Sequence, residues 1–170
     1  MNCFSYRRAT AADLPAICEL GESVNAVHHE AFPHIFAAPG TPDRDAMHWA
    51  ASLGSPPLER GREEACVVVA EFEGRVLGFV SVAMANESHS LLQPLRFGRI
   101  GSASVSKPWQ GQGVGRGLMR EAHAWVRTRG GQEVRLVVWA FNEGARRLYQ
   151  DLGYELRSLN LACSLEDGEA

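Results

Sequence analysis

The sequence predicts an α+β fold of three layers, in which helices cover both faces of one central mixed, mostly antiparallel sheet. Three strand patterns follow one another without a helix between them, at Cys66–Phe72, Arg75–Ala83 and Arg96–Val105. Glu73-Gly74 joins the first two as a tight-turn candidate, which predicts an antiparallel hairpin. A helical pattern then separates the third strand from an apolar strand pattern, and such a unit is parallel with a right-handed crossover.

Composition and charge narrow the class of protein. The 170 residues suit one domain spanning residues 1–170, and 45% hydrophobic residues is ordinary for a globular protein. A net charge of −3 and a pI near 6.1 argue against a nucleic-acid binder, which usually carries a basic surplus. No apolar run is long enough to cross a membrane, and MNCFSYRRAT lacks the apolar core of a secretory signal. We therefore expect a cytoplasmic protein.

The cysteines and histidines give no sign of a metal site. The four cysteines are scattered, without a CxxC pair or zinc-ligand spacing, at Cys3, Cys18, Cys66 and Cys163. We expect them to be reduced and mostly buried thiols. The histidines His28, His29 and His34 also lack the i, i+4 spacing that places two ligands on one helical face. The sequence therefore predicts no bound metal.

The N-terminal part predicts a strand followed by a helix. Phe4–Arg8 is a short strand candidate, and apolar residues at helical spacing then predict a helix from Ala11 to about His28. Thr10 and Asp13 at the start of this helix form a variant of the capping box.

Prolines and glycines divide the next part of the chain. Asp43 opens a second predicted helix, which ends near Leu53-Gly54. Ser55–Glu64, with two prolines and two glycines, predicts a solvated loop, and Met84–Leu95 predicts another.

The C-terminal part predicts two strands and two helices. The helix after the third strand should end at Gly130-Gly131. Val134–Ala140 is apolar on both faces, which is typical of an inner strand covered on both sides. Asn142 can cap a further helix through Leu152, and Tyr154–Leu165 alternates well enough for one long strand or a bent pair.

The stretch Gln110–Gly115 (QGQGVG) carries the first functional signal. Glycines at every second position allow positive φ and the close approach of a ligand. The loop leads into the N-terminus of a strong amphipathic helix, where the helix dipole and free N–H groups favour an anion. The pattern therefore predicts a phosphate cradle.

Two common phosphate motifs do not fit this loop. A dinucleotide fingerprint requires G-x-G-x-x-G, but counting from Gly111 its third glycine position holds Arg116. No acidic residue closes the following strand, which ends at Ala140-Phe141-Asn142. A Walker A loop needs Lys-Ser or Lys-Thr after its second glycine, and no glycine here is followed by either pair.

Two segments resemble the GNAT superfamily of N-acetyltransferases. Val105–Gly115 resembles its acyl-CoA motif, Gln/Arg-x-x-Gly-x-Gly/Ala after a strand, with Gln110, Gly113 and Gly115 at the signature positions. Val138–Tyr154 resembles the superfamily segment Asn-x-x-Ala-x-x-x-Tyr-x-x-x-Gly-Phe, with Tyr in place of the final Phe. The order of predicted elements also matches the GNAT fold through the whole chain.

The resemblance implies acetyl-CoA as cosubstrate and no metal. The amides of Gln110–Gly115 would hold the CoA pyrophosphate, and the backbone around Val105 would pair with the pantetheine arm where two parallel strands splay apart. Asn142 would also contact the pantetheine. The residues assigned to CoA in this way are Val105, Gln110, Gly111, Gln112, Gly113, Val114, Gly115, Arg116 and Asn142.

The resemblance also implies a catalytic acid, because Tyr149 would protonate the departing CoA thiolate. A phenol suits this role, since it is a neutral donor at pH 7. Spacing alone favours another interpretation, in which Ala145, Leu148 and Tyr149 share one helical face and the ring belongs to the core. Asn142 likewise has a structural interpretation as a helix N-cap.

The residues leave the general base open. Many members carry a carboxylate on the strand before the glycine loop, whereas Ile100–Val105 has none. The candidates are Ser102 or Ser104 holding a water chain, Glu71 on the neighbouring hairpin, and His28, His29 or His34, because imidazole can accept a proton near neutral pH.

The resemblance therefore implies an N-acetyltransferase that transfers an acetyl group from acetyl-CoA to a primary amine by direct attack within a ternary complex. The amine would belong to a small molecule or to a protein, and would bind between the first two helices and the last strands. The alternative is a non-catalytic acyl-CoA-binding or regulatory module of the same fold. We expect no nucleic-acid or membrane partner, and a homodimer by analogy with the family.

Overall fold

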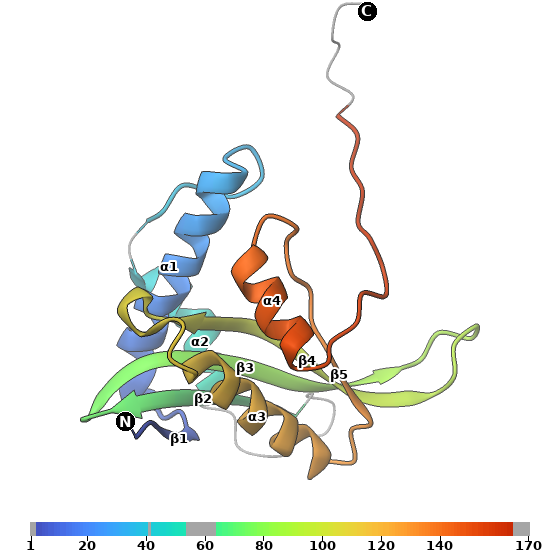
Figure 1. The fold of residues 1–170 in the computed structure, drawn as a ribbon, viewed down its shortest axis with the longest axis horizontal. Helices are drawn as coiled ribbons and strands as arrows, with labels where there is room; N and C mark the ends of the chain where they lie inside the picture. The colour runs from blue at the N-terminus through green and yellow to red at the C-terminus, as the bar shows by residue number, and fades with distance from the viewer. Residues whose placement is uncertain (1–2, 41, 54–63, 165–170) are drawn as a thin grey trace, which may run out of the picture.

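The computed structural model describes residues 3–40, 42–53 and 64–164, which form a sheet with helices on both faces (Figure 1). The strands are β1 (Ser5–Arg8), β2 (Ala65–Phe72), β3 (Arg75–Glu87), β4 (Leu95–Val105) and β5 (Glu133–Arg135). The α-helices are α1 (Leu14–Ala31), α2 (Ala46–Leu53), α3 (Val114–Arg127) and α4 (Glu143–Asp151). The 3₁₀ turns are η1 (Ala11–Asp13), η2 (Pro42–Asp45) and η3 (Lys107–Trp109).

The sheet is mixed and mostly antiparallel, as predicted. Its strand order is β1-β2-β3-β4-β5, and every neighbouring pair is antiparallel except β4 and β5. Glu73 and Gly74 turn the β2–β3 hairpin with φ of 50° and 76°, which confirms the predicted turn. β3 and β4 are longer than predicted, since they pair from Gly78 with Val105 to Glu87 with Leu95. Met84–Glu87 and Leu95, at the two ends of the predicted Met84–Leu95 loop, are therefore strand.

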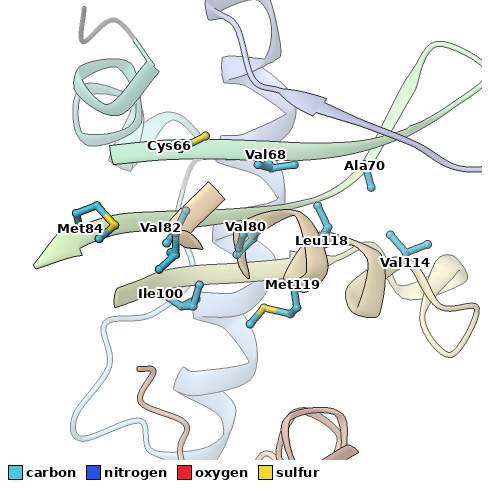
Figure 2. Packing of buried hydrophobic residues seen from close by; sticks show 12 residues of the cluster. Cys66, Val68, Ala70, Val80, Val82, Met84, Ile100, Val114, Leu118 and Met119 are labelled. Carbon is cyan, nitrogen blue, oxygen red and sulfur yellow. The ribbon is translucent and has the colours of Figure 1, made fainter. Parts of the chain in front are cut away.

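Two hydrophobic cores occupy the two faces of the sheet. Along β2, Cys66, Val68 and Ala70 face the core that α3 covers, whereas Val67 and Val69 face α1 and α2. Figure 2 shows the first core, in which Val80 and Val82 of β3 lie with Leu118 and Met119 of α3. Because side chains alternate along a strand, a run of apolar residues fills both cores at once. The three-layer architecture is confirmed.

The start of the first helix follows the predicted capping pattern. The backbone N–H of Thr10 donates to Asp13 Oδ2 at 2.7 Å, and the Thr10 hydroxyl donates to the same oxygen at 3.0 Å. The helical region is one 3₁₀ turn, η1, followed by α1, which continues past the predicted end to Ala31. Residues 54–63, which include most of the predicted Ser55–Glu64 loop, lie outside the described residues.

Two predictions about the C-terminal strands are wrong. Val134–Ala140 is not an inner strand, because only Glu133–Arg135 pairs with β4 and the side chain of Val137 is 93% exposed. Tyr154–Leu165 is not a paired strand or a bent pair, since residues 154–164 join no strand ladder and Leu165 is outside the described residues. Figure 1 shows this segment leaving the body of the molecule beyond α4. Within the described residues, β5 is therefore an edge strand that pairs with β4 alone.

One arginine ties together the first strand, the first helix and β2. Arg7 donates from Nη1 and Nη2 to the two carboxylate oxygens of Asp13 at 2.8 and 2.9 Å. Its Nε and Nη2 also donate to Glu71 Oε2 at 2.9 and 2.8 Å. Asp13 is buried, and the Arg7 guanidinium lowers the pKa of its carboxyl from 3.8 to about 2.

We predict that Asp13→Asn lowers the free energy of unfolding at pH 7 by about 1–3 kcal/mol, because a buried charge-assisted pair is lost. The folded carboxyl has the lower pKa, so its contribution is complete above pH 3.8 and fades as the pH falls towards about 2. Urea denaturation of both proteins across this range measures the effect. Asp151→Asn, at an exposed ion pair, should change stability by less than about 0.5 kcal/mol. An equal loss in both variants would contradict the prediction.

Candidate active site

Gly111 and Gly113 in the loop are required by the backbone conformation and not by a lack of space for a side chain. Gly111 and Gly113 have φ of 73° and 89°, a region that favours glycine. A Cβ on either residue would meet no atom within 4 Å, so open space surrounds both positions. The side chain of Gln110 braces the loop, since its Nε2 donates to the carbonyl of Val105 at 2.8 Å. Gln112 Nε2 likewise donates a hydrogen bond to the carbonyl of Pro108 at 2.9 Å.

The loop presents the N-terminus of α3. Gly113 is the N-cap and has no side chain, so no side chain caps the N–H groups of the first turn. Val114 is buried and anchors the helix start in the core, while Gly111, Gln112 and Gly113 are exposed. An exposed helix N-terminus with unpaired donors stabilises an anionic group, and the residues present therefore fit a pyrophosphate.

The edge of β4 beside this loop is open. β4 pairs with β5 only at Phe97, Gly98 and Arg99, although it continues for six further residues to Val105. In the described residues, Ile100–Val105 is paired with β3 alone, because β5 ends at Arg135. The predicted splay between the parallel strands is therefore confirmed, and it leaves backbone donors and acceptors for an extended ligand.

α4 and its N-cap supply the other predicted site residues. Asn142 is the N-cap of α4, and its Oδ1 accepts from the backbone N–H of Ala145 at 3.1 Å. The cap prediction is confirmed, and the side-chain amide N–H groups remain as donors for a ligand. Tyr149 packs against the α3-side core, and burial raises the pKa of its phenol. It is therefore protonated at neutral pH.

α3 and α4 meet at the glycine loop. A Cβ on Gly115 would lie 3.2 Å from Leu148 Cδ2, so glycine permits this close approach of the two helices. Arg116 Nη2 lies 3.2 Å from Asp151 Oδ2 in an ion pair that joins the first turn of α3 to the end of α4. The helix carrying Tyr149 is thus held directly beside the proposed phosphate cradle.

A cavity of about 220 Å³ lies on the other face of the sheet, against α1 and α2. Its lining is partly apolar and partly polar, and consists of Gly21, Val24, Asn25, His28, Phe36, Asp45, Trp49 and Ser102. Ser102 comes from the open stretch of β4, so the cavity borders the same strand as the glycine loop. Sequence reasoning missed Asn25, Asp45 and Trp49, because nothing in their spacing shows that they meet.

Two residues that line this cavity, His28 and Trp49, differ in the hydrogen bonding of their ring nitrogens. His28 Nδ1 lies 2.8 Å from the carbonyl of Val24; because a carbonyl can only accept, Nδ1 carries the proton. In the neutral ring, Nε2 is then a free proton acceptor. Trp49 is buried, and its Nε1–H has no hydrogen-bond partner among the described residues. This nitrogen is shielded from solvent and lies against Gly21, 3.4 Å from the position that a Cβ on Gly21 would take.

The other base candidates are placed less favourably. Glu71 is engaged by Arg7 and lies on β2, two strands away from β4. His34 is exposed after the end of α1, with its ring against Phe32. Ser104 is buried opposite Phe79, on the α1 side of the sheet but outside the lining of the cavity. Of the histidines, only His28 lines the cavity.

The described residues contain neither a candidate metal cluster nor a membrane-spanning helix. Among the described residues, no group of three or more His, Cys, Asp or Glu side chains is arranged to hold a metal ion. None of the helices in the described ranges is long and apolar enough to span a bilayer.

We predict that Gly113→Ala weakens acetyl-CoA binding by about tenfold or more, because an alanine with φ near 89° is strained and the loop must shift. Isothermal titration calorimetry measures the Kd. Gly130→Ala is the matched control, since Gly130 has φ of 73° at the far end of α3 with no atom near its Cβ position. Unchanged Kd in Gly113→Ala, or equal weakening in both, would contradict the prediction.

Comparisons with solved structures agree with this architecture. A mutant of the BH1408 protein from Bacillus halodurans superposes with a TM-score of 0.85 at 19% identity, covering 95% of this chain and 99% of that one. An acetyltransferase from Vibrio fischeri gives 0.61 at 22%, covering 79% and 96%. An aminoglycoside acetyltransferase, meta-AAC0020 from an uncultured soil metagenomic sample, was solved with sisomicin and gives 0.65 at 18%, covering 96% and 97%. These likenesses show a shared fold.

Sequence comparison assigns the family. A search of curated proteins found no match. The model of the acetyltransferase (GNAT) family matches residues 23–154, which include the glycine loop, the open edge of β4 and all of α4. The chain therefore belongs to the GNAT acetyltransferase family.

Proposed function

We propose that this protein transfers an acetyl group from acetyl-CoA to a primary amine of a small molecule, by direct attack within a ternary complex. The observation that carries the proposal is the open stretch of β4. Its end at Val105 leads to the glycine loop, and Ser102, three positions earlier, lines the cavity against α1 and α2. A cosubstrate paired with this edge would thus border the place where an acceptor can bind.

Acetyl-CoA supplies a thioester, whose carbonyl carbon the amine nitrogen attacks as the carbon–sulfur bond breaks. Tyr149 gives its phenol proton to the departing sulfur, so CoA leaves as a thiol. The raised pKa of the phenol keeps that proton available at neutral pH. Asn142 contributes its amide N–H groups to the pantetheine, and the uncapped first turn of α3 holds the pyrophosphate.

His28 is the base in this proposal. Its Nδ1–H is held by the carbonyl of Val24, so Nε2 accepts the proton that the amine loses. The ring also lies 5.4 Å from Phe141, which directly precedes the Asn142 cap. The base side of the cavity therefore adjoins the loop that leads to the acid on α4.

The lining of the cavity indicates the class of amine. Phe36 and Trp49 offer aromatic surface, which suits an apolar or ring-containing body. Asp45 is the one carboxylate in the lining of this cavity and would attract the ammonium form during binding. We therefore favour a compact amine with an apolar body over an exposed protein amine.

We further propose that the enzyme is cytoplasmic, consists of a single domain and acts as a homodimer. Cys3, Cys18, Cys66 and Cys163 all carry thiols rather than disulfides, which supports a reducing compartment. The exposed leucines of the C-terminal segment support self-association.

A panel of compact primary amines with acetyl-CoA, with detection of the released thiol, tests the proposed function. Turnover with at least one amine, and acetylation of that amine by mass spectrometry, is expected. Tight CoA binding without turnover on any amine would instead support the non-catalytic acyl-CoA-binding module.

We predict that Tyr149→Phe lowers kcat by roughly 10²–10⁴-fold, because the sulfur loses its proton donor. The Kd for acetyl-CoA should stay within about twofold, since burial of the ring is retained. Steady-state kinetics and calorimetry separate the two effects. Tyr154→Phe is the control, because the Tyr154 hydroxyl bonds to His123 Nε2 at 2.7 Å and has no proposed part in the chemistry. Full turnover in Tyr149→Phe would exclude the acid role.

We predict that His28→Gln lowers kcat by about 10²-fold while acetyl-CoA affinity is retained, because the base is lost but the cradle is not. His34→Gln, at an exposed position outside the cavity lining, should leave kcat unchanged. The pair is compared by steady-state kinetics with the best amine of the panel. A lower kcat in His34→Gln together with an unchanged kcat in His28→Gln would contradict the assignment of His28 as the base and favour His34.

A further inference from the structure

Aromatic rings gather where the end of α1 meets the stretch between β5 and α4. We call this group the aromatic cluster, and its members are His28, Phe32, Phe36, Trp139 and Phe141. In the described part of the chain, its phenylalanines and its tryptophan pack in neither of the two hydrophobic cores. The cluster is therefore a separate packing unit, built from two segments that are far apart in the sequence.

The imidazole of His28 has three ring neighbours in the cluster. Its centroid lies 4.8 Å from that of Phe36, 5.4 Å from that of Phe141 and 6.3 Å from that of Trp139. The rings meet in tilted or edge-to-face geometry, which aromatic pairs prefer. Nδ1 is in addition tied to the carbonyl of Val24 at 2.8 Å. These contacts together restrict rotation of the imidazole about its bond to Cβ.

Trp139 supports this arrangement from outside the cavity. Its ring lies 5.0 Å from Phe36 and 5.5 Å from Phe32, in addition to the contact with His28. Trp139 is not part of the cavity lining, and its side chain is 36% exposed. Because Phe36 and His28 do line the cavity, Trp139 contacts two lining rings without reaching the space where an acceptor would bind.

The backbone that carries Trp139 is fixed to α4. The N–H of Asn142 donates to the carbonyl of Trp139 at 3.0 Å, which closes a four-residue turn. Arg146 Nη1 donates to the carbonyl of Ala140 within this turn at 3.1 Å. In the described residues, strand pairing of this segment ends at Arg135. The turn therefore depends on α4 at one end and on the aromatic cluster at the other.

The remaining rings of the cluster are fixed to α1. His29 Nδ1 lies 2.8 Å from the carbonyl of Phe36, and the N–H of Phe36 donates to the carbonyl of Phe32 at 3.0 Å. These bonds fold the chain after α1 back over the helix and place the Phe36 ring on His28. Trp139 thus packs against rings whose own backbone is already held.

We propose that Trp139 is a positioning residue, which holds the His28 ring in the orientation and tautomer that make Nε2 the proton acceptor. The inference rests on the proposed function, in which His28 is the base. Without the indole, His28 loses a ring neighbour and Phe36 loses its outer support. The imidazole can then turn, and its two nitrogens can exchange roles. A base that is already held in place needs no reorganisation during the reaction.

Nuclear magnetic resonance of the His28 ring nitrogens tests the proposal without turnover. The shifts are measured at about pH 8.5, where an ordinary imidazole is neutral, and His28→Gln identifies which signals belong to this ring. The wild type should show a protonated Nδ1 and an unprotonated Nε2. Trp139→Ala should show shifts averaged between the two tautomers. An unchanged, fully Nδ1-protonated ring in Trp139→Ala would overturn the proposal.

Steady-state kinetics with the best amine of the panel provide the second readout. Trp139→Ala should lower kcat about tenfold, because the base is misplaced, while the KM for acetyl-CoA changes less than about threefold. Trp139→Phe should recover most of the kcat, since a phenyl ring retains part of the contact with Phe36. Trp125→Ala removes an indole that packs against the α3-side core, and should change neither kcat nor the His28 shifts. Equal losses of kcat in the two alanine variants would contradict the positioning role.

Failure of the positioning role differs from failure of the proposed function. Full turnover in His28→Gln would overturn the base itself, whatever the nitrogen shifts show. Lost turnover in His28→Gln, with unchanged shifts and kcat in Trp139→Ala, would overturn the role of Trp139 alone. If no amine of the panel is acetylated, the nitrogen shifts alone decide whether Trp139 holds the ring.

Discussion

The separation of β4 from β5 after Arg99 and Arg135 is the constraint on which the rest of the site depends. Arg135 closes the paired region, because its guanidinium stacks 3.9 Å from the centroid of the Phe97 ring and pairs with Glu87 of β3 at 2.9 Å. Beyond it the strands diverge, and β4 keeps hydrogen-bonding groups without a strand partner among the described residues. Such groups are costly to bury unless a ligand pairs with them.

In the proposed function, the two faces of the sheet carry different chemical roles. On one face, α3 and α4 bring the glycine loop and Tyr149 together, with Gly115 allowing the close contact to Leu148. On the other face, α1 and α2 enclose the cavity that holds His28 and Trp49. An open strand between them gives a cosubstrate access to both. In the proposed function, Tyr149 and His28 would therefore act on the thioester from opposite faces of the sheet.

Much of the fold and part of the site can be predicted from the sequence alone, because they depend on residues that are close together in the chain. The positive φ of Gly111 and Gly113, the capping bonds of Asp13 and the N-cap of Asn142 depend on residues a few positions apart. The same holds for the Glu73-Gly74 turn. Such short-range chemistry shows in residue spacing, so the glycine loop, the element order as far as α4 and the family resemblance can be read from the sequence.

Only the tertiary structure decided which residues meet across the chain. Glu71 was a reasonable base from its strand, but Arg7, 64 positions away, engages it in an ion pair. His28, Trp49 and Ser102 line one cavity because three separate elements pack together, which no periodicity records. Val134–Ala140 has the composition of an inner strand, yet only Glu133–Arg135 pairs with β4 and the side chain of Val137 is 93% exposed. Composition predicts that this segment is covered on both sides, and only the tertiary structure shows that no second strand pairs with it among the described residues.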